Sequence, residues 1–223
     1  MFDTAGDCEQ PWWSMRQVPT GLLVTFEGIE GSGKSTQIGL TKAYVEEQEY
    51  PCLVTKEPGG SPLGEELRSF LLHRRDLRID PLTELLLIEA DRAEHVAEVI
   101  RPALDEGRII LCDRYTDATI AYQGYARGLD IAVITQLNHW ATGGLTPHCT
   151  IVLDCPVVVG MARAKGEDRF EREGKKFHEQ VREGYLRIAR QEPQRVTVVS
   201  GQGEQATIQE AIRRIIRPLL DRR

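Results

Sequence analysis

The sequence predicts an α/β fold of the three-layer type, in which helices cover both faces of a mostly parallel, five-stranded sheet. Two observations predict it. Short apolar runs of strand length alternate with longer helix-compatible runs along nearly the whole chain. The chain of 223 residues, 41% of them hydrophobic, is long enough for one domain with a full core.

The alternation begins with a strand and ends with a helix. The apolar runs expected to form strands are Leu22–Glu27, Cys52–Lys56, Arg108–Asp113, Thr150–Asp154 and Arg195–Ser200. The helices expected between and after them are Lys34–Gln48, Leu63–Leu72, Leu82–Leu104, Asp117–Tyr125, Ile131–Thr142, Val157–Ala164, Phe177–Gln191 and Thr207–Leu220. In such parallel sheets, ligands bind beyond the carboxyl ends of the strands.

Charge and hydropathy exclude several classes of protein. The formal net charge is −6, from 28 basic and 34 acidic residues, which argues against a broad nucleic-acid-binding surface. No apolar run reaches the ~20 residues that a membrane-spanning helix needs. The cysteines are odd in number and form no C-x-x-C pair, so buried thiols in a reducing cytosol are expected rather than a metal or redox site. They are Cys8, Cys52, Cys112, Cys149 and Cys155. The protein is therefore expected in the cytoplasm.

Residues 1–20 differ from the rest of the chain. They are polar and acidic apart from Trp12 and Trp13, and they lack the basic and apolar regions of a secretory signal. We expect a flexible N-terminal extension, although the tryptophans could also pack on the body of the protein or contact a partner. The folded domain is expected to span residues 21–223.

The loop after the first expected strand fits the phosphate-binding pattern G-x-x-x-x-G-K-[ST]. It lies between an apolar run and a helix-compatible run, where backbone N–H groups and the helix dipole can face a phosphate. Lys34 would reach the β- and γ-phosphates, and the Ser35 hydroxyl would bind Mg²⁺. A merely glycine-rich turn is the alternative. The expected ATP-binding residues are Gly28, Ile29, Glu30, Gly31, Ser32, Gly33, Lys34, Ser35 and Thr36.

A second polar pair follows the strand expected over Arg108–Asp113. A carboxylate at this position, Asp113, can hold Mg²⁺ or its waters beside the loop serine, so Ser35 and Asp113 are the expected metal ligands. The alternative role of Asp113 is a helix cap. Arg114 would project into the same cleft and suits bidentate binding of a phosphate, unless it forms a structural salt bridge.

Taken together, these motifs make the chain similar to a known family. Its segments resemble bacterial thymidylate kinase in order and in spacing over about residues 22–220. The segments that carry the resemblance are Phe26–Gln37, Thr55–Gly60, Ala90–Val96, Asp113–Tyr115, Ala121–Gly124 and Asp168–Glu171. The resemblance implies a nucleoside-monophosphate kinase domain of the P-loop NTPase type. It also implies transfer of the γ-phosphoryl group of ATP to dTMP with Mg²⁺, in dTTP synthesis, by a homodimer that binds neither nucleic acid nor membrane.

The resemblance also assigns roles to residues on the dTMP side. It implies that Glu30 contacts the sugar 3′-hydroxyl, that Arg68 and Arg114 lie near the phosphate, and that Tyr122 lies under the deoxyribose and crowds out a 2′-hydroxyl. It places Arg92 and Thr119 at the two edges of the thymine. The full expected dTMP site is Glu30, Glu57, Pro58, Arg68, Ile88, Arg92, Arg114, Thr119, Tyr122 and Gln123. The bond between Glu57 and Pro58 is expected to be cis.

Ile88 and Arg92 also fit a base-binding role by their spacing. They lie four residues apart on one expected helix and so share a face, which could give a base one apolar wall and one donor fork. In the alternative, Ile88 lies in the core and Arg92 pairs with Glu89 or Asp91. The family commonly has Phe at position 88, Ser at position 118 and Arg at position 56, where this chain has Ile88, Ala118 and Lys56. Ile lacks the aromatic face that stacks on thymine.

The segment Met161–Lys176 is dense in basic residues and is expected to form a short mobile lid. In the family, a cation that stabilises the transferring phosphoryl group comes either from the phosphate loop or from the lid. The loop position is Gly31 here, so the resemblance implies the lid subtype. Arg163, Lys165 and Arg169 are the lid candidates, and with Lys34 and Arg114 they complete the expected catalytic set. A solvated charged loop is the alternative.

Three rival functions differ in the motifs that they need. A regulatory GTPase would need an N-K-x-D motif, which the sequence lacks. A non-catalytic nucleotide switch would not need Asp113, Arg114, Tyr122 and a basic lid together. A kinase for another nucleoside monophosphate or for a deoxynucleoside is the nearest rival, and Ile88 is the residue that supports it.

Overall fold

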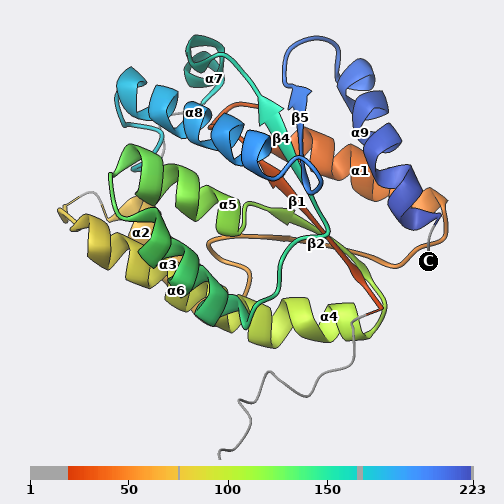
Figure 1. Ribbon diagram of the computed structural model, residues 1–223, viewed down its shortest axis with the longest axis horizontal. Coiled ribbons are helices and arrows are strands. Elements are labelled where there is room, and N and C mark those ends of the chain that lie inside the picture. The colour runs from red at the N-terminus through yellow and green to blue at the C-terminus, as the bar shows by residue number, and fades with distance from the viewer. Residues whose placement is uncertain (1–19, 75, 165–167, 222–223) are drawn as a thin grey trace, which may run out of the picture.

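Five parallel strands form a single sheet in the order β2-β3-β1-β4-β5 (Figure 1). The strands are β1 (Leu22–Glu27), β2 (Cys52–Lys56), β3 (Ile109–Asp113), β4 (Cys149–Asp154) and β5 (Val196–Ser200). The computed structural model describes residues 20–74, 76–164 and 168–221, so most of the expected N-terminal extension and Lys165 lie outside the described residues. The α/β fold with a parallel, five-stranded sheet is confirmed.

Helices α1 (Lys34–Glu47) and α9 (Gln205–Leu220) lie side by side on one face of the sheet (Figure 1). Side chains alternate along β1, and Val24 and Phe26 point into this layer. Ile212 and Ile216 of α9 are fully buried against them, because residues four apart share one face of a helix. The apolar face of α9 therefore accounts for its docking.

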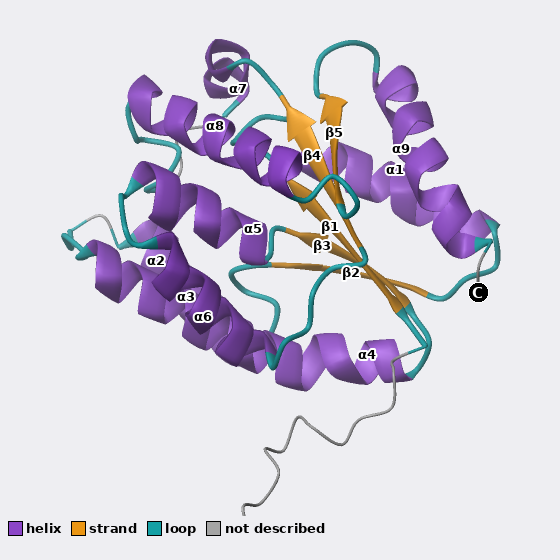
Figure 2. Cartoon of the chain, in the orientation of Figure 1, coloured by secondary structure: helices purple, strands orange, loops and turns teal. Residues whose placement is uncertain are grey.

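The other face is covered in two parts. Near β1 and β3, Leu23 and Ile110 pack against Ile100 and Leu104. Ile100 and Leu104 belong to a continuous helical run made of α3 (Pro81–His95), a π-helical stretch η1 (Val96–Ile100) and α4 (Arg101–Asp105). Near β4 and β5, the covering elements are α8 (Lys175–Gln191) and a second π-helical stretch, η2 (Ile120–Ala126). The two parts make up the third layer (Figure 2).

The remaining helices begin at residues suited to helix starts. Helix α2 (Pro62–His73) starts after Ser61, whose hydroxyl accepts a hydrogen bond from the Gly64 N–H at 3.0 Å. Asp80 caps α3 in the same way, and Asp130 caps α6 (Ile131–Thr142). Helix α5 (Thr116–Thr119) runs directly into η2, and α7 (Val157–Arg163) follows β4. None of the helices in the described ranges has the length and apolarity that a bilayer crossing requires.

The expected uniform helices Leu82–Leu104 and Asp117–Tyr125 each contain a π-helical stretch instead. In the first of these, Pro102 lies two residues after the end of the stretch, in the first turn of α4. Proline has no N–H to donate, and its ring clashes with the carbonyl four residues earlier, so a widened turn before it relieves the clash. In the second, the wide turns carry Tyr122 and Gln123. Such turns recur at functional sites.

The strand order brings the expected site residues to one edge. Strand β1 lies between β3 and β4, and its residue Phe26 is in register with Asp113 of β3. The loop that starts at Gly28 therefore leaves the middle of the sheet beside Asp113. The end of β2, with Glu57 and Pro58, lies one strand further along.

Candidate active site

A cavity of about 790 Å³ opens at the carboxyl edge of the sheet. It is lined by the phosphate loop from Glu30 onward, by the strand ends and by residues from α2, α3, η2 and the lid. Every residue of the expected dTMP site lines it, as do both expected metal ligands; these are Glu30, Glu57, Pro58, Arg68, Ile88, Arg92, Arg114, Thr119, Tyr122, Gln123, Ser35 and Asp113. Gly28, Ile29 and Arg169 are expected site residues that do not line it.

The phosphate loop connects β1 to α1 and bends around Lys34. The Lys34 ammonium is buried and donates to the Gly28 carbonyl at 3.0 Å and to the Ile29 carbonyl at 3.1 Å. Burial, followed by the nearby Arg114 charge, lowers the pKa of Lys34 from its ordinary value. The cation is thus held inside the loop by the two expected site residues, Gly28 and Ile29, that lie outside the cavity wall.

The loop packs backbone to backbone against α7. A Cβ atom at Gly31, whose φ is +67°, would lie 2.2 Å from the Gly160 carbonyl oxygen. This approach explains why position 31 carries no basic side chain, and it sets Arg163 of α7 beside the loop. Arg163 lines the cavity, with Nη1 at 3.4 Å from the carbonyl oxygens of Gly31 and Gly201.

Glu30 is the centre of a polar cluster next to the loop. Its Oε1 accepts hydrogen bonds from Arg114 Nη2 at 2.9 Å and from the Tyr122 hydroxyl at 2.6 Å, and its Oε2 lies 3.2 Å from His178 Nδ1. Burial alone would raise the pKa of Glu30, but the Arg114 charge and the other contacts outweigh it and hold that pKa well below its ordinary value. Glu30 is therefore an ionised acceptor.

Arg114 adopts an unusual backbone conformation for a side chain of its size. Its φ is +70°, and its N–H donates to the Phe26 carbonyl at 3.0 Å. The guanidinium lies over the Tyr122 ring, 4.8 Å from the centroid, and contacts Glu30 and Tyr185. A non-glycine residue in this region is strained, and such strain persists where surrounding contacts impose it. The salt bridge weighed as an alternative for Arg114 is present, and the side chain also lines the cavity.

Asp113 and Ser35 can provide part of a magnesium site. Asp113 Oδ1 is buried without a hydrogen-bond partner in the described residues, and both side chains line the cavity. Carboxylate and hydroxyl oxygens are ligands that Mg²⁺ accepts. The described residues contain no group of three or more His, Cys, Asp or Glu side chains able to hold a metal. This donor set thus fits an ion whose other ligands come from substrate phosphates or water.

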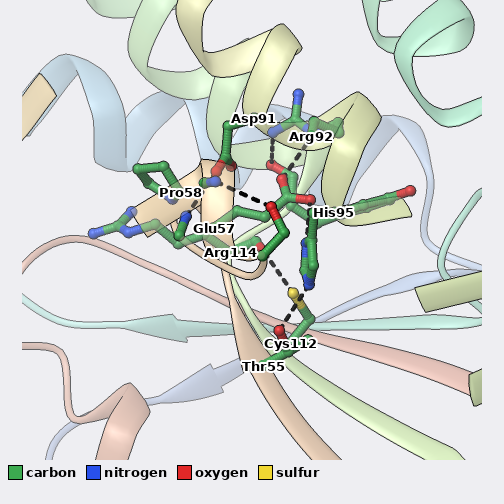
Figure 3. A network of polar contacts seen from close by, with 12 residues as sticks. Thr55, Glu57, Pro58, Asp91, Arg92, His95, Cys112 and Arg114 are labelled. Atoms are coloured by element: carbon green, nitrogen blue, oxygen red, sulfur yellow. Dashed lines mark hydrogen bonds and ion pairs between the residues drawn. The ribbon is translucent and has the colours of Figure 1, made fainter. Parts of the chain in front are cut away.

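A buried ionic network lies at the opposite end of the cavity. Figure 3 shows Asp91, Arg92 and His95 of α3 converging on Glu57 and the turn after β2. Arg92 is 1% exposed; its Nε donates to Glu57 Oε2 at 2.8 Å and its Nη1 to Glu89 Oε1 at 3.0 Å. Burial would lower the pKa of Arg92, but the charges of Glu57 and Glu89 raise it above its ordinary value. The pairing with Glu89 that was the alternative for Arg92 is thus observed, although Arg92 also lines the cavity.

The rest of this network fixes the turn that follows β2. Nη2 of Arg92 donates to the Tyr115 carbonyl at 3.1 Å, and Nη1 also contacts Asn138 Oδ1. Asp91 Oδ1 accepts from the Gly59 N–H at 2.8 Å, so Asp91 is not the partner of Arg92. The bond between Glu57 and Pro58 is cis, as expected.

The walls between the two ends are a mixture of apolar and polar groups. Ile88 lines the cavity and is half-buried, which excludes the alternative that it is a core residue. Thr119 Oγ1 is buried without a partner in the part of the chain that the structure describes. Arg68 donates to the Pro58 carbonyl at 2.7 Å, and Gln123 Nε2 donates to Glu84 Oε1 at 2.7 Å.

The described part of the lid does not bring its two basic candidates together. Arg169 Nη2 lies 2.7 Å from Glu84 Oε2, and its Nε donates to the Leu71 carbonyl at 3.1 Å. Glu84 is 1% exposed and needs a cation nearby, which explains why Arg169 turns away from the cavity. Arg127 and Glu173 extend this cluster, with an ion pair of 2.6 Å. The charged lid is therefore tied to α3 and η2 and is not only a solvated loop.

Comparisons with known proteins agree with this geometry. The sequence model of the family described as thymidylate kinase matches residues 26–212. The chain belongs to the thymidylate kinase family. A relative from Synechococcus sp. named thymidylate kinase is 50% identical over 199 residues, which cover 89% of this chain and 96% of the relative. One of the same name from Symbiobacterium thermophilum is 48% identical over 204 residues, covering 91% and 95%. A crystal structure of thymidylate kinase from Ehrlichia chaffeensis superposes with a TM-score of 0.75 at 33% identity, over 89% of this chain and all of that one.

The sequence did not predict several of the residues that line the cavity of this thymidylate kinase family member. Gly201 and Gly203, between β5 and α9, and Gln205 and Ile208, in the first turn of α9, line the end nearest the phosphate loop. A glycine pair directly after the last strand is a signal that could have found them, because ligands gather at that edge. Phe170 and Leu72 also line the cavity. His178 and Tyr185 were also missed, because they lie behind the wall and match no motif.

One residue at a strand end has a structural role instead. Asp154, at the end of β4, pairs with Arg182 through two hydrogen bonds of 2.6 and 2.8 Å. It does not line the cavity of this thymidylate kinase family member. Position at the carboxyl edge of the sheet therefore does not by itself place a residue in the cavity wall.

Proposed function

We propose that this chain transfers the γ-phosphoryl group of ATP to dTMP, giving dTDP and ADP for dTTP synthesis in the cytoplasm. One observation carries the proposal. A single cavity joins a phosphate loop at one end to the Glu57–Arg92 network and the Tyr122 ring at the other. Two nucleotides placed end to end need such a shape, because their phosphates must meet in the middle. Family membership supports the same conclusion.

On the ATP side, the loop residues Gly28 to Thr36 would surround the phosphates. Lys34 would exchange its two loop carbonyls for the β- and γ-phosphate oxygens. Ser35 and Asp113 would hold Mg²⁺, which when bound neutralises phosphate charge and orients the oxygens. The residues after β5, among them Gly201 and Gln205, line the same cavity and would contact the rest of ATP.

On the dTMP side, charge and shape support separate roles. Arg114 and Arg68 would bind the 5′-phosphate, and ionised Glu30 would accept from the sugar 3′-hydroxyl. Arg92 would offer its remaining Nη2–H to the base, with Thr119 Oγ1 at another edge. Tyr122 would pack under the deoxyribose. Ile88, Glu57, Pro58 and Gln123 would complete the wall.

A cation beyond Lys34 is needed where charge spreads over the transferring group. Arg114 supplies one from the dTMP side, and we propose Arg163 as the lid cation, since it lies at the cavity beside Gly31. Arg169 could reach the transferring phosphoryl group only if the lid rearranged and its ion pair with Glu84 broke. Lys165 stays a candidate whose placement lies outside the described residues.

A homodimer is part of the proposal. Helices α3 and α6 expose large apolar side chains, with Trp140 60% exposed and Leu86 50% exposed. Such a surface is typical of an interface between copies of a chain. Sedimentation equilibrium of the wild-type chain and of Trp140→Glu tests it. A wild-type monomer at micromolar concentration would contradict it.

The activity is tested with a substrate panel. We expect ADP formation, in a coupled assay with ATP and Mg²⁺, to be fastest with dTMP among dTMP, dUMP, dCMP, dAMP, dGMP and thymidine. A higher kcat/KM for another monophosphate or for thymidine would favour the rival kinase that Ile88 suggests. Nucleotide binding without turnover of any acceptor would favour a switch protein.

A further inference from the structure

Two buried side chains of α8, His178 and Tyr185, reach from behind the cavity to residues that line it. They are 2% and 1% exposed and lie about two turns apart on one face of the helix. His178 meets Glu30 and Tyr185 meets Arg114. Neither residue lines the cavity, so neither touches a ligand there directly.

Tyr185 links Arg114 to a fixed carboxyl group. Its hydroxyl donates to Glu27 Oε2 at 2.7 Å and accepts from Arg114 Nη1 at 3.2 Å. The other oxygen of Glu27 accepts from the Tyr115 N–H at 2.7 Å, so Glu27 is anchored to the backbone. The orientation of the Arg114 fork therefore depends on the Tyr185 hydroxyl at one nitrogen and on Glu30 at the other.

His178 faces the side of Glu30 that its other partners leave free. Arg114 and Tyr122 both donate to Oε1, whereas Oε2 lies 3.2 Å from His178 Nδ1. The far nitrogen, Nε2, is buried without a hydrogen-bond partner in the described ranges. A buried polar ring needs a reason for its place. Among the described residues, the one polar contact of the ring is with the Glu30 carboxylate, which the sugar would meet.

Close packing of α8 against η2 fixes the position from which His178 and Tyr185 make these contacts. A Cβ atom at Gly184 would lie 2.8 Å from the Tyr125 ring and 3.2 Å from the Ala121 Cα. Only glycine allows this approach, so α8 packs directly on η2, the element that carries Tyr122. The helix thus fixes His178, Tyr185 and the Tyr122 ring relative to one another.

We propose that His178 and Tyr185 are positioning residues for the monophosphate acceptor. Tyr185 orients Arg114 toward the phosphate, and His178 orients Glu30 toward the sugar 3′-hydroxyl. The inference rests on the proposed function, which gives Arg114 and Glu30 those roles. It adds that α8, which begins at the end of the lid segment, fixes the positions of Arg114 and Glu30 from outside the cavity.

Ligands that lack one group each can separate the two roles. Calorimetry without ATP would measure the binding of dTMP, of thymidine, which lacks the phosphate, and of 3′-deoxythymidine monophosphate, which lacks the 3′-hydroxyl. Tyr185→Phe should weaken dTMP binding about tenfold and leave thymidine binding unchanged, because loss of one charge-assisted contact acts through the phosphate. His178→Gln should weaken dTMP and thymidine about fivefold and spare the 3′-deoxy ligand.

The controls keep the packing and change the contact. His178→Asn should bind all three ligands like wild type, because its amide nitrogen occupies the place of Nδ1 while that of Gln does not. Tyr125→Phe keeps the ring that packs at the same α8–η2 interface, removes only its hydroxyl, and should change nothing. If His178→Gln does not fold, the His178 ring resonances of the wild-type protein serve instead, and they should shift more with dTMP than with the 3′-deoxy ligand.

The outcomes distinguish this inference from the function beneath it. If the wild-type chain neither binds nor phosphorylates dTMP, the proposed function fails. If it does both, and Tyr185→Phe and His178→Gln weaken all three ligands equally or none of them, the positioning roles are overturned. Equal loss for every ligand together with a lower melting temperature is the signature of a purely structural role.

Discussion

The two ends of the cavity differ in how their charges are satisfied. The end with the Glu57–Arg92 network, where we propose that the base binds, is called the base end, and the end with the phosphate loop the phosphate end. At the base end, each nitrogen of the Arg92 guanidinium already has a protein acceptor, and the group is 1% exposed. At the phosphate end, Asp113 Oδ1 and Ser32 Oγ have no partner in the described residues. Lys34 is turned to the carbonyls of its own loop.

The difference follows from what each end would bind. A nucleobase is neutral and offers few hydrogen bonds, so it cannot compensate a buried charge, and the protein must pair Arg92 itself. Phosphates and a metal ion carry enough charge to satisfy the groups that meet them. The base end is therefore built before the ligand arrives, whereas the phosphate end is completed by it. Changes at the base end should act mainly on stability, and changes at the phosphate end mainly on turnover.

The largest expected effect is on the folding of the base end. Arg92→Met would leave Glu57 and Glu89 buried without their cation, and it should lower the free energy of unfolding by about 3–5 kcal/mol. Urea unfolding followed by circular dichroism measures this. Adding Glu57→Gln to the same chain should recover part of the loss, because one uncompensated charge is removed. If Arg92→Met lowered the free energy of unfolding by less than about 1 kcal/mol, the network would not be what stabilises the base end.

At the phosphate end, Lys34→Ala should act on catalysis instead. Loss of its charge on the transferring group should reduce kcat/KM for ATP by about 10² or more, while the unfolding free energy stays near that of the wild type. Lys42→Ala is the matched control, because Lys42 lies on the same helix and pairs only at the surface with Glu46. Near-wild-type turnover in a folded Lys34→Ala variant would contradict the phosphate-loop assignment.

The base end should also show a pH dependence of stability. Burial, with the Glu57 charge second, raises the pKa of Asp91 from 3.8 to about 6. A carboxyl whose pKa is raised on folding takes up its proton more readily in the folded state, so stability is lost as pH rises from about 4 to 6. The loss should reach up to about 3 kcal/mol. Asp91→Asn, which keeps the acceptor for the Gly59 N–H, should flatten this profile, whereas the exposed Asp105→Asn should not. Equal slopes in both variants would refute the assignment.

The phosphate end could be predicted from sequence more fully than the base end. The phosphate-binding residues from Gly28 to Ser35 are consecutive in the sequence, so one motif identifies all of them. The strand before the loop was predicted with the bounds that the structure shows. Asp113 could be placed beside it because parallel strands end at one edge. The network at Arg92 is different. It joins α3 to Glu57, Asn138 and Tyr115, and no local pattern specifies which of several carboxylates the guanidinium meets.

The π-helical stretches and the lid arginines also depend on contacts between distant segments, which local sequence patterns do not reveal. The π-helical stretches arise where helix packing and Pro102 compete with uniform propensity, and periodicity alone did not reveal them. Charge density marked the lid as a segment to test. It could not separate Arg163 from Arg169, because the deciding contact is the buried Glu84 on a distant helix.

The smallest expected effect would separate those two arginines. Arg163 lies at the cavity beside the loop, so Arg163→Ala should lower kcat about tenfold with little change in the KM for ATP, as expected for a contact that strengthens in the transition state. Arg169 is bound to Glu84 and to the Leu71 carbonyl, so Arg169→Ala should leave kcat within about twofold and lower the melting temperature instead. Steady-state kinetics and thermal unfolding of both variants decide the matter. The reverse pattern would mean that the lid rearranges to bring Arg169 to the phosphates. If Arg163, Lys165 and Arg169 can all be neutralised, singly and together, with kcat held within about twofold, the second cation comes from Arg114 or Arg68 on the acceptor side.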